Sequence, residues 1–211
     1  MNALQVNQML QVVSKMFIDK QQELSELDRK IGDGDHGVSM ARGAEAALKA
    51  LNEHSKDHTV NEAFLIMGHA FLDHIGGAMG PLFGSIFLAF AEATLHEDQL
   101  TVSNMKKGFV LALDHVVDLG GASPGDKTLV DAMAPTAECA RDFNELDLAS
   151  FLQECQEASH QGVLATIPMI AKRGRSKYRK AQSVGFQDAG ATSFYYFVQT
   201  MTQYVLEEGA Q

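Results

Sequence analysis

Three aspartates in a short, glycine-broken segment are the residues of this sequence best suited to chemistry. Asp28, Asp33 and Asp35 lie in the segment DRKIGDGDHG, residues 28–37, between two runs with helical periodicity. The glycines of this segment permit backbone angles that other residues resist, so a tight loop can turn all three carboxylates toward one point. Carboxylates held that close raise one another's pKa, and a cation relieves the repulsion. We therefore predict that Asp28, Asp33 and Asp35 bind a metal ion.

The ligand chemistry narrows the choice of metal. Oxygen-only ligands favour a hard cation such as Mg²⁺ or Ca²⁺ over zinc. An EF-hand calcium loop that began at Asp33 would place Gly43 or Ala44 at its last ligand position, and neither residue can be a ligand. Mg²⁺ usually takes few protein carboxylates and completes its shell with water and substrate phosphates. Two interpretations remain from these residues alone, a magnesium–phosphate site and a polar turn whose aspartates only cap helices.

The elements that must position this loop are helices. Apolar residues recur at helical spacing along the chain, and we find no strand-like alternation of useful length. Thr59 and Glu62 match a capping box, and Pro81 suits the first turn of a helix. The expected helices cover residues 3–26, 38–51, 59–74, 81–95, 101–120, 128–139, 148–171 and 190 to the end. We predict an all-α fold, an eight-helix antiparallel up-and-down barrel or bundle that forms a single domain over residues 1–211.

The connections between these helices differ in composition. In an up-and-down bundle, alternate connections lie at the same end, which groups the aspartate loop with residues 76–81, 120–127 and 173–189. These connections contain glycine, whereas the polar links near 52–58, 96–101 and 141–147 contain none. Packing gives independent loops no reason to segregate in this way, but a shared ligand does. We therefore expect a binding site at the end where the glycine-containing connections meet.

The parts of this end fit a nucleotide. Glycine loops let backbone N–H groups approach phosphate oxygens, and helix N-termini present positive dipole ends. Lys127 and Arg175 could add positive charge. Residues 120–128, GGASPGDKT, are similar to a Walker A loop, but Asp126 interrupts the pattern and no strand precedes it. We interpret this segment as a different anion loop, and the alternative is a helix cap followed by a turn.

A basic run precedes the last helix. Residues 172–180 hold six of the 17 basic residues of the chain. Such a run is either a solvated mobile loop or a surface that faces a ligand and a partner protein. We select Arg175, which follows a glycine, as the member that faces the ligand.

Composition limits the function classes. The formal charge of −10 argues against general nucleic-acid binding. No run approaches the length of a membrane span, and the first residues lack the pattern of a signal peptide, so we expect a cytoplasmic protein. Cys139 and Cys155 lack metal-ligand spacing and are expected to be small core residues.

Four motifs, in order along the chain, resemble one family. They are IGDGDHG at 31–37, GGAMGPLFG at 76–84, PGDKT at 124–128 and GFQDAGATS at 185–193. Together they resemble the L subunit of phosphotransferase-system-dependent bacterial dihydroxyacetone kinase over nearly the whole chain. The resemblance implies a barrel with ADP or ATP at one end, held through two Mg²⁺ ions on Asp28, Asp33 and Asp35. It also implies that the nucleotide is lined by His36, Gly37, Val38, Ser39, Ala78, Met79, Gly120, Leu129, Arg175, Asp188, Ala189 and Gly190.

The resemblance further implies a division of labour among subunits. Bound ADP is phosphorylated by a phosphohistidine-carrying subunit of the phosphotransferase system, and the γ-phosphoryl group then passes to dihydroxyacetone held by the K subunit. Such chemistry needs positioning and charge neutralisation more than a protein nucleophile. Two alternatives remain, an ATP-dependent kinase module for another acceptor and a non-catalytic nucleotide-binding regulator of a transcription factor.

Four positions depart from the family pattern. Met79 stands where serine is usual, Lys180 where glycine is common, Phe186 where histidine is common and Ala189 where proline is common. These departures affect the expected nucleotide affinity and docking surface, and they leave the three aspartates unchanged.

Overall fold

The computed structural model describes residues 1–53 and 59–208, and within these residues the secondary-structure elements are all helices. The predicted all-α class is confirmed. Of the predicted link 52–58, residues 54–58 lie outside the described part of the chain. The helices are α1 (Ala3–Asp19), α2 (Gln21–Ile31), α3 (His36–Glu53), α4 (Val60–His74), α5 (Met79–Ala93), α6 (Val102–Gly120), α7 (Val130–Asp142), α8 (Leu148–Ala165), the 3₁₀-helix η1 (Ser176–Ser183) and α9 (Ala189–Glu208).

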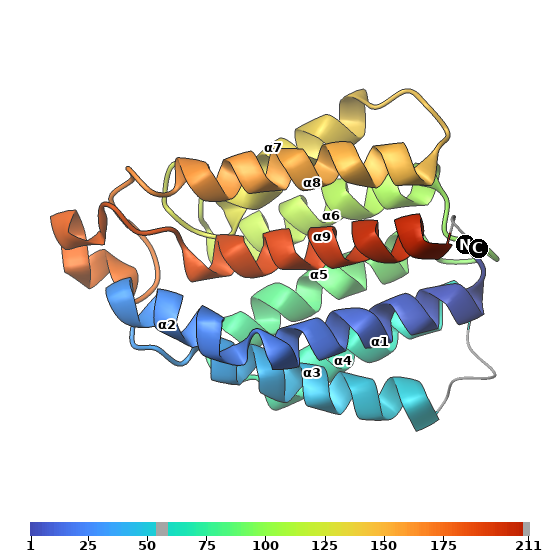
Figure 1. Ribbon diagram of the computed structural model, residues 1–211, viewed down its shortest axis with the longest axis horizontal. Helices are drawn as coiled ribbons and strands as arrows, with labels where there is room; N and C mark the ends of the chain where they lie inside the picture. Colours follow the sequence, from blue (N-terminus) through green and yellow to red (C-terminus); the bar gives the residue numbers. More distant parts are fainter. Residues whose placement is uncertain (54–58, 209–211) are drawn as a thin grey trace.

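The long helices pack side by side in an up-and-down bundle (Figure 1). Contacts run in chain order from α3 to α9, and α1 contacts both α3 and α9, so the ring of helices closes. Helix α2 and the 3₁₀-helix η1 lie at one end, and the start of α1 lies at the other (Figure 1). The end of α9 also lies there, because Gln5 Nε2 donates to Glu208 Oε2 at 3.4 Å.

The predicted first helix, residues 3–26, is wrong as a single element because the chain breaks at Lys20. This residue has φ −84° and ψ 3°, and α2 starts immediately after it. Helix α2 then leans against the start of α3, where a Cβ on Gly37 would lie 1.9 Å from the carbonyl oxygen of Gln21. Glycine at 37 therefore allows this approach, which carries α2 directly into the aspartate loop.

The predicted seventh helix also differs, since α8 ends at Ala165 and not near residue 171. Pro168 disfavours helical angles in the residue before it, which accounts for a helix end just upstream. Pro135, in contrast, lies inside a continuous α7. Proline has no N–H to donate to the carbonyl four residues earlier, that of Asp131, and Gly162 of α8 packs closely against this carbonyl.

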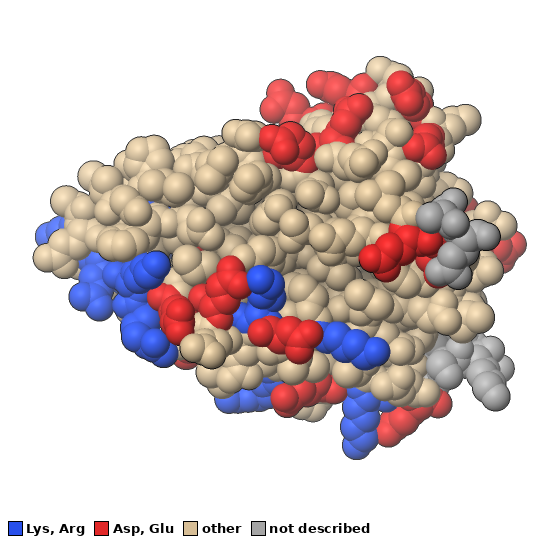
Figure 2. All heavy atoms as spheres, viewed as in Figure 1, with Lys and Arg blue, Asp and Glu red and all other residues tan. Residues whose placement is uncertain are grey.

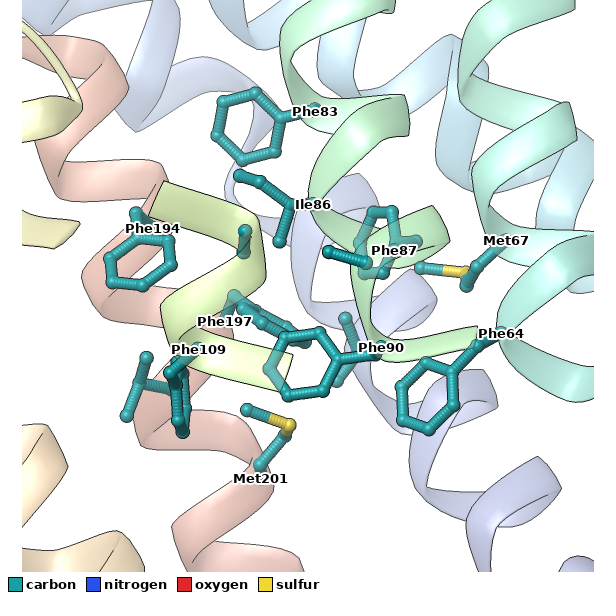
Figure 3. Packing of buried hydrophobic residues seen from close by; sticks show 14 of the residues in the cluster. Phe64, Met67, Phe83, Ile86, Phe87, Phe90, Phe109, Phe194, Phe197 and Met201 are labelled. Carbon is teal, nitrogen blue, oxygen red and sulfur yellow. The ribbon is translucent and has the colours of Figure 1, made fainter. Parts of the chain in front are cut away.

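Phenylalanine rings fill the centre of the bundle (Figure 3). Phe87 of α5 lies 5.0 Å from Phe71 of α4 and 5.3 Å from Phe197 of α9 between ring centroids. Phe90, one turn further along, lies 5.1 Å from Phe109 of α6. Truncating one such buried ring to alanine typically costs about 3–5 kcal/mol. This packing holds α5 in position, and the N-terminus of α5 lies at the same end of the bundle as the aspartate loop. None of the described helices has the length and apolar character needed to cross a membrane.

Candidate functional site

A pocket of about 300 Å³ opens at the end of the bundle where α2 and η1 lie. Its walls come from the aspartate loop, the glycine turn before α5, the connection between α6 and α7, and the segment between α8 and α9. These are the four glycine-containing connections that the sequence places at one end. The break in the first helix leaves this grouping intact, because α2 continues toward the end that α1 approaches (Figure 1).

Most of the predicted nucleotide-lining residues reach this pocket. Those that line it are His36, Ser39, Ala78, Met79, Gly120, Leu129, Arg175, Asp188, Ala189 and Gly190. Gly37 and Val38 are absent from its wall, since Gly37 packs against α2 and the Val38 side chain is exposed. The pocket thus gathers residues from distant parts of the chain, while contact with a nucleotide remains a prediction for each.

The three aspartates form one cluster, with a ligand oxygen from each lying within 4.8 Å of the others. Asp28 is the anchor, because its Oδ2 accepts a 2.7 Å hydrogen bond from Gly34 N, and Gly34 adopts a φ of 82° that favours glycine. Burial, and then the charges of Asp33 and Asp35, raise the pKa of Asp28. Burial and the charge of Asp33 likewise raise the pKa of Asp35. A cation shared by these oxygens would remove the repulsion, so the cluster fits a hard divalent ion.

Residues 167–187, here called the lip, cross the mouth of the pocket between α8 and α9. Arg175 of the lip forms an ion pair with Asp33 of the cluster. Gly185 N donates to Ile167 O at 2.8 Å, which joins the two ends of the lip. The two ends of the lip are therefore held together, and its middle is tied to the aspartate cluster.

Lys127 lines the pocket, as the sequence suggested, but its ammonium group donates to protein carbonyl groups. Its side chain is only 1% exposed, and its ammonium donates to the carbonyl oxygens of Thr166 at 2.7 Å, Met169 at 3.2 Å and Phe186 at 2.5 Å. Burial lowers the pKa of this ammonium. The donors of Lys127 are thus directed at the end of α8 and at both ends of the lip. Sequence alone could not find this role, because the carbonyl partners lie about 40–60 residues away.

The segment 120–128 forms a helix cap followed by a turn, which is the alternative to the anion loop that we favoured from the sequence. Gly121 closes α6 in a left-handed conformation with φ 61°. Asp131 then accepts hydrogen bonds from Gly125 N at 2.5 Å and Thr128 N at 2.7 Å. These N–H groups are satisfied by a protein carboxylate, and Asp126 pairs with Lys172 at 3.2 Å.

Two further titratable groups line the pocket. His36 is buried, with its Nε2 2.6 Å from Ser193 Oγ, and burial lowers its pKa to about 4. Asp188 accepts a 2.8 Å hydrogen bond from Ala191 N at the start of α9, and burial raises its pKa to about 7. His36 is therefore neutral near pH 7, and the Asp188 carboxyl keeps its proton to a higher pH than an ordinary aspartate does.

One wall of the pocket was missed by the sequence reasoning. It is apolar and is formed by Leu82, Val116, Ala122 and Val130. In the sequence these residues are indistinguishable from the apolar faces of core helices, so no signal separated them from the core. The pocket also includes the glycine turn 76–77, Arg173 and Ser176. An apolar wall facing a charged cluster suits a ligand with a flat ring at one end and anionic groups at the other.

Comparison with known proteins identifies the family to which this chain belongs. Residues 30–203 match the model of the DAK2 domain family, so the chain belongs to that family. The chain is 35% identical over 188 residues to the PEP-dependent dihydroxyacetone kinase ADP-binding subunit DhaL of Escherichia coli K12, covering 88% of this chain and 89% of that one. It is also 35% identical over 193 residues to the corresponding PTS-dependent DhaL subunit of Lactococcus lactis, covering 90% and 93%.

Longer proteins contain a similar part. The L-erythrulose 1-kinase of Mycolicibacterium smegmatis is 29% identical over 190 residues, which span 33% of its length. The crystal structure of the dihydroxyacetone kinase from C. freundii in complex with AMP-PNP and Mg²⁺ superimposes with a TM-score of 0.72 at 23% identity. That match covers 96% of this chain and 34% of the kinase chain. The same helical fold therefore occurs within larger kinases.

Proposed function

We propose that this chain is the nucleotide-binding subunit of a dihydroxyacetone kinase and holds ADP or ATP in the pocket at the end of the bundle. One observation carries the proposal: the aspartate cluster, Arg175 and an apolar wall converge on one pocket, in a chain 35% identical to ADP-binding subunits. The fold supports a single nucleotide-binding domain over residues 1–211. Such a subunit would act in the cytoplasm.

Different residues of the pocket would bind different parts of the nucleotide. Asp28, Asp33 and Asp35 would hold Mg²⁺, two ions by analogy with the family, which when bound neutralises phosphate charge. Arg175 of the lip lines the pocket and would donate to a phosphate oxygen. Helices α5 and α9 begin at Met79 and Ala189, which line the pocket, so the first backbone N–H groups of these helices would donate to phosphate oxygens.

Four further predicted residues would contact other parts of the nucleotide. His36 and Ser39 lie beside the aspartate cluster, and Leu129 belongs to the same side as the apolar wall that would take the base. Met79 presents a thioether where the family usually has a serine hydroxyl, so we expect one phosphate contact fewer at this position.

The reaction would run in two transfers. A phosphohistidine on a phosphotransferase-system subunit would transfer its phosphoryl group to ADP. This breaks the P–N bond of the phosphohistidine and forms the P–O bond between the β- and γ-phosphates of ATP. The hydroxyl oxygen of dihydroxyacetone, held by the K subunit, then attacks the γ-phosphorus, loses its proton and becomes the phosphate ester, while ADP remains. This chain orients the nucleotide and shields it from water, which is the main protein contribution to phosphoryl transfer.

Binding measurements test the proposal first. Isothermal titration of the full chain with ADP in the presence of MgCl₂ should give saturable binding that chelation of Mg²⁺ abolishes. Asp33→Ala and Asp35→Ala should each abolish ADP retention while the helical circular-dichroism signal persists. Asp114→Ala, which removes an exposed aspartate of α6, is the matched control and should bind ADP normally. Unchanged ADP binding in both cluster variants would disprove the metal assignment.

A reconstituted reaction separates the proposal from its alternatives. The chain is combined with a phosphorylated phosphotransferase-system subunit, the K subunit and dihydroxyacetone, and the phosphate ester is measured. Product that depends on the phosphohistidine subunit supports the proposal. Product that requires only free ATP would indicate an independent kinase module. ADP binding without turnover in either mixture would indicate a regulator, such as one that binds a transcription factor.

A further inference from the structure

The lip is strongly basic on an acidic protein. Its basic residues are Lys172, Arg173, Arg175, Lys177, Arg179 and Lys180, and residues 167–187 contain no acidic residue. Since the whole chain has a formal charge of −10, the part outside the lip carries −16. Figure 2 shows Lys and Arg side chains gathered at the end of the molecule where Figure 1 places η1.

Half of these charges are already paired within the protein. Lys172 and Arg173 contact Asp126 at 3.2 Å and 3.3 Å, and Arg175 pairs with Asp33. Within the described residues, the remaining three have no ion-pair partner: they are Lys177, Arg179 and Lys180, all exposed on η1. Their charge is therefore available to something outside the chain.

An exposed aromatic ring lies among these unpaired charges. Tyr178 is 75% exposed, and Lys177 Nζ lies 5.0 Å from the centroid of its ring. Tyrosine and arginine are the residue types enriched at protein–protein contacts, because each offers a large contact area together with a polar end.

The backbone conformation of Lys180 independently indicates that this part of η1 has a function. Its φ of 49° and ψ of −127° lie in a region that favours glycine, where a side chain costs about 1–3 kcal/mol. Its backbone is fixed, because Lys180 O accepts from Ser183 Oγ at 2.6 Å, and that hydroxyl accepts from Ala171 N at 2.9 Å. The side chain itself points to solvent and contributes nothing to packing that offsets this cost. Strain of this kind concentrates where a residue serves a function.

We propose that the outer face of η1, formed by Lys177, Tyr178, Arg179 and Lys180, is a docking surface for an acidic face of the subunit that holds the phosphoryl acceptor. The identity of that partner rests on the function proposed above, whereas the charge of its contact face follows from the lip alone. Lys177 is two residues from Arg175, which lines the pocket, so a protein docked here sits at the mouth from which the phosphoryl group leaves.

The charge distribution favours a protein over a nucleic acid. A long polyanion would extend past the lip and meet the −16 charge of the remaining surface. An acidic patch on a protein is small enough to contact the lip alone. Charge pairs at such a rim act mainly on the rate of association and on its salt dependence.

The test compares two triple variants of equal charge. The lip variant is Lys177→Gln/Arg179→Gln/Lys180→Gln, and the control is Lys15→Gln/Arg42→Gln/Lys107→Gln, which removes two lysines and one arginine that are also exposed. Both bring the chain to a formal charge of −13. Binding of each full-length variant to the purified dihydroxyacetone-binding subunit is followed by surface plasmon resonance at low and at physiological salt.

We expect the lip variant to lose about tenfold or more in affinity at low salt, mostly through slower association, and to lose much of its salt dependence. The control should stay within about twofold of the wild type. An equal loss in both variants, or no loss in the lip variant, overturns the proposal. Binding of a short DNA duplex that requires the lip, with subunit binding unchanged, also overturns it in favour of a nucleic acid.

A parallel titration keeps the two proposals separate. ADP affinity in MgCl₂ is measured for the wild type and both variants, and all three should agree, because the substituted side chains lie outside the pocket. A wild type that fails to bind ADP, yet loses subunit binding when the lip is neutralised, would disprove the nucleotide function and leave the docking surface standing.

Discussion

Arg175 of the lip forms an ion pair with Asp33 of the aspartate cluster. This ion pair links the segment between α8 and α9 to the loop between α2 and α3. Both residues line the pocket. The mouth of the site is thereby bounded by groups of opposite charge, and an incoming anion with its cation can engage both at once.

Replacing Arg175 should weaken nucleotide binding more than it weakens the fold. Arg175→Ala removes a charged donor worth about 1.5–3 kcal/mol to a phosphate, which corresponds to about 10- to 100-fold in ADP affinity. Isothermal titration at fixed MgCl₂ measures this loss. Arg179→Ala, on the outer face of η1, is the control and should leave ADP affinity unchanged. Equal ADP affinities for Arg175→Ala and the wild type would exclude the phosphate contact.

Neutralising one aspartate of the cluster should have opposite effects with and without magnesium. Asp35→Asn relieves like-charge repulsion, which for an exposed group is worth about 0.5 kcal/mol, and should raise the melting temperature by about 1–2 °C in metal-free buffer. With MgCl₂ the wild type should gain stability and the variant should gain less. Differential scanning fluorimetry across a magnesium titration measures both effects, with Asp114→Asn as control. A variant stabilised by magnesium as much as the wild type would contradict the cluster assignment.

Removing the Lys127 ammonium should loosen the base of the lip. Lys127→Met leaves the carbonyls of Thr166, Met169 and Phe186 without their shared donor, at a cost of about 1–3 kcal/mol. Trypsin should then cleave the basic lip at least several-fold faster, and hydrogen exchange should rise there more than in α4 and α5. Lys106→Met is the matched control, because Lys106 Nζ donates to Phe143 O at 2.5 Å away from the pocket. Uniformly faster exchange throughout the protein would instead indicate a global loss of stability.

Acid should destabilise the protein through His36. The pKa of His36 is about 4 in the folded chain, against an ordinary value of 6.5 in the unfolded chain. Below pH 6.5 the imidazole is therefore protonated in the unfolded state but stays neutral in the folded state. The free energy of unfolding falls as the pH drops toward 4, by about 3 kcal/mol in total. Urea unfolding of the wild type and His36→Gln across this range measures the effect. The free energy of unfolding should fall less steeply with acid in the variant, and parallel curves would contradict it.

The sequence reasoning succeeded where a property was local or periodic. Helical spacing predicted the bundle, and the capping box at Thr59 is present as predicted. The break at Lys20 was missed because no proline or glycine marks it. Helix α2 then packs against Gly37, a tertiary contact that the sequence around Lys20 does not reveal. The end of α8 was missed because its apolar spacing continues past Ala165, although Pro168 was available as a signal.

In the candidate site, too, local features could be predicted from the sequence and features set by tertiary structure could not. The three aspartates fall within eight residues, so their clustering could be predicted from the spacing of glycines around them. The role of Lys127 could not, because a lysine after a glycine-rich turn is typical of phosphate loops and its actual partners are brought in by tertiary structure. Likewise, whether Leu82 lines a pocket or the core depends on where its helix starts relative to its neighbours.

The placement of the first and last described helices has a practical consequence. The start of α1 and the end of α9 adjoin each other at the end of the barrel away from the pocket. An affinity tag, a fluorescent reporter or a tethered enzyme joined before α1 or after α9 should therefore leave the mouth of the pocket accessible. Immobilisation through such a tag should accordingly orient every copy with its pocket toward the bulk solution.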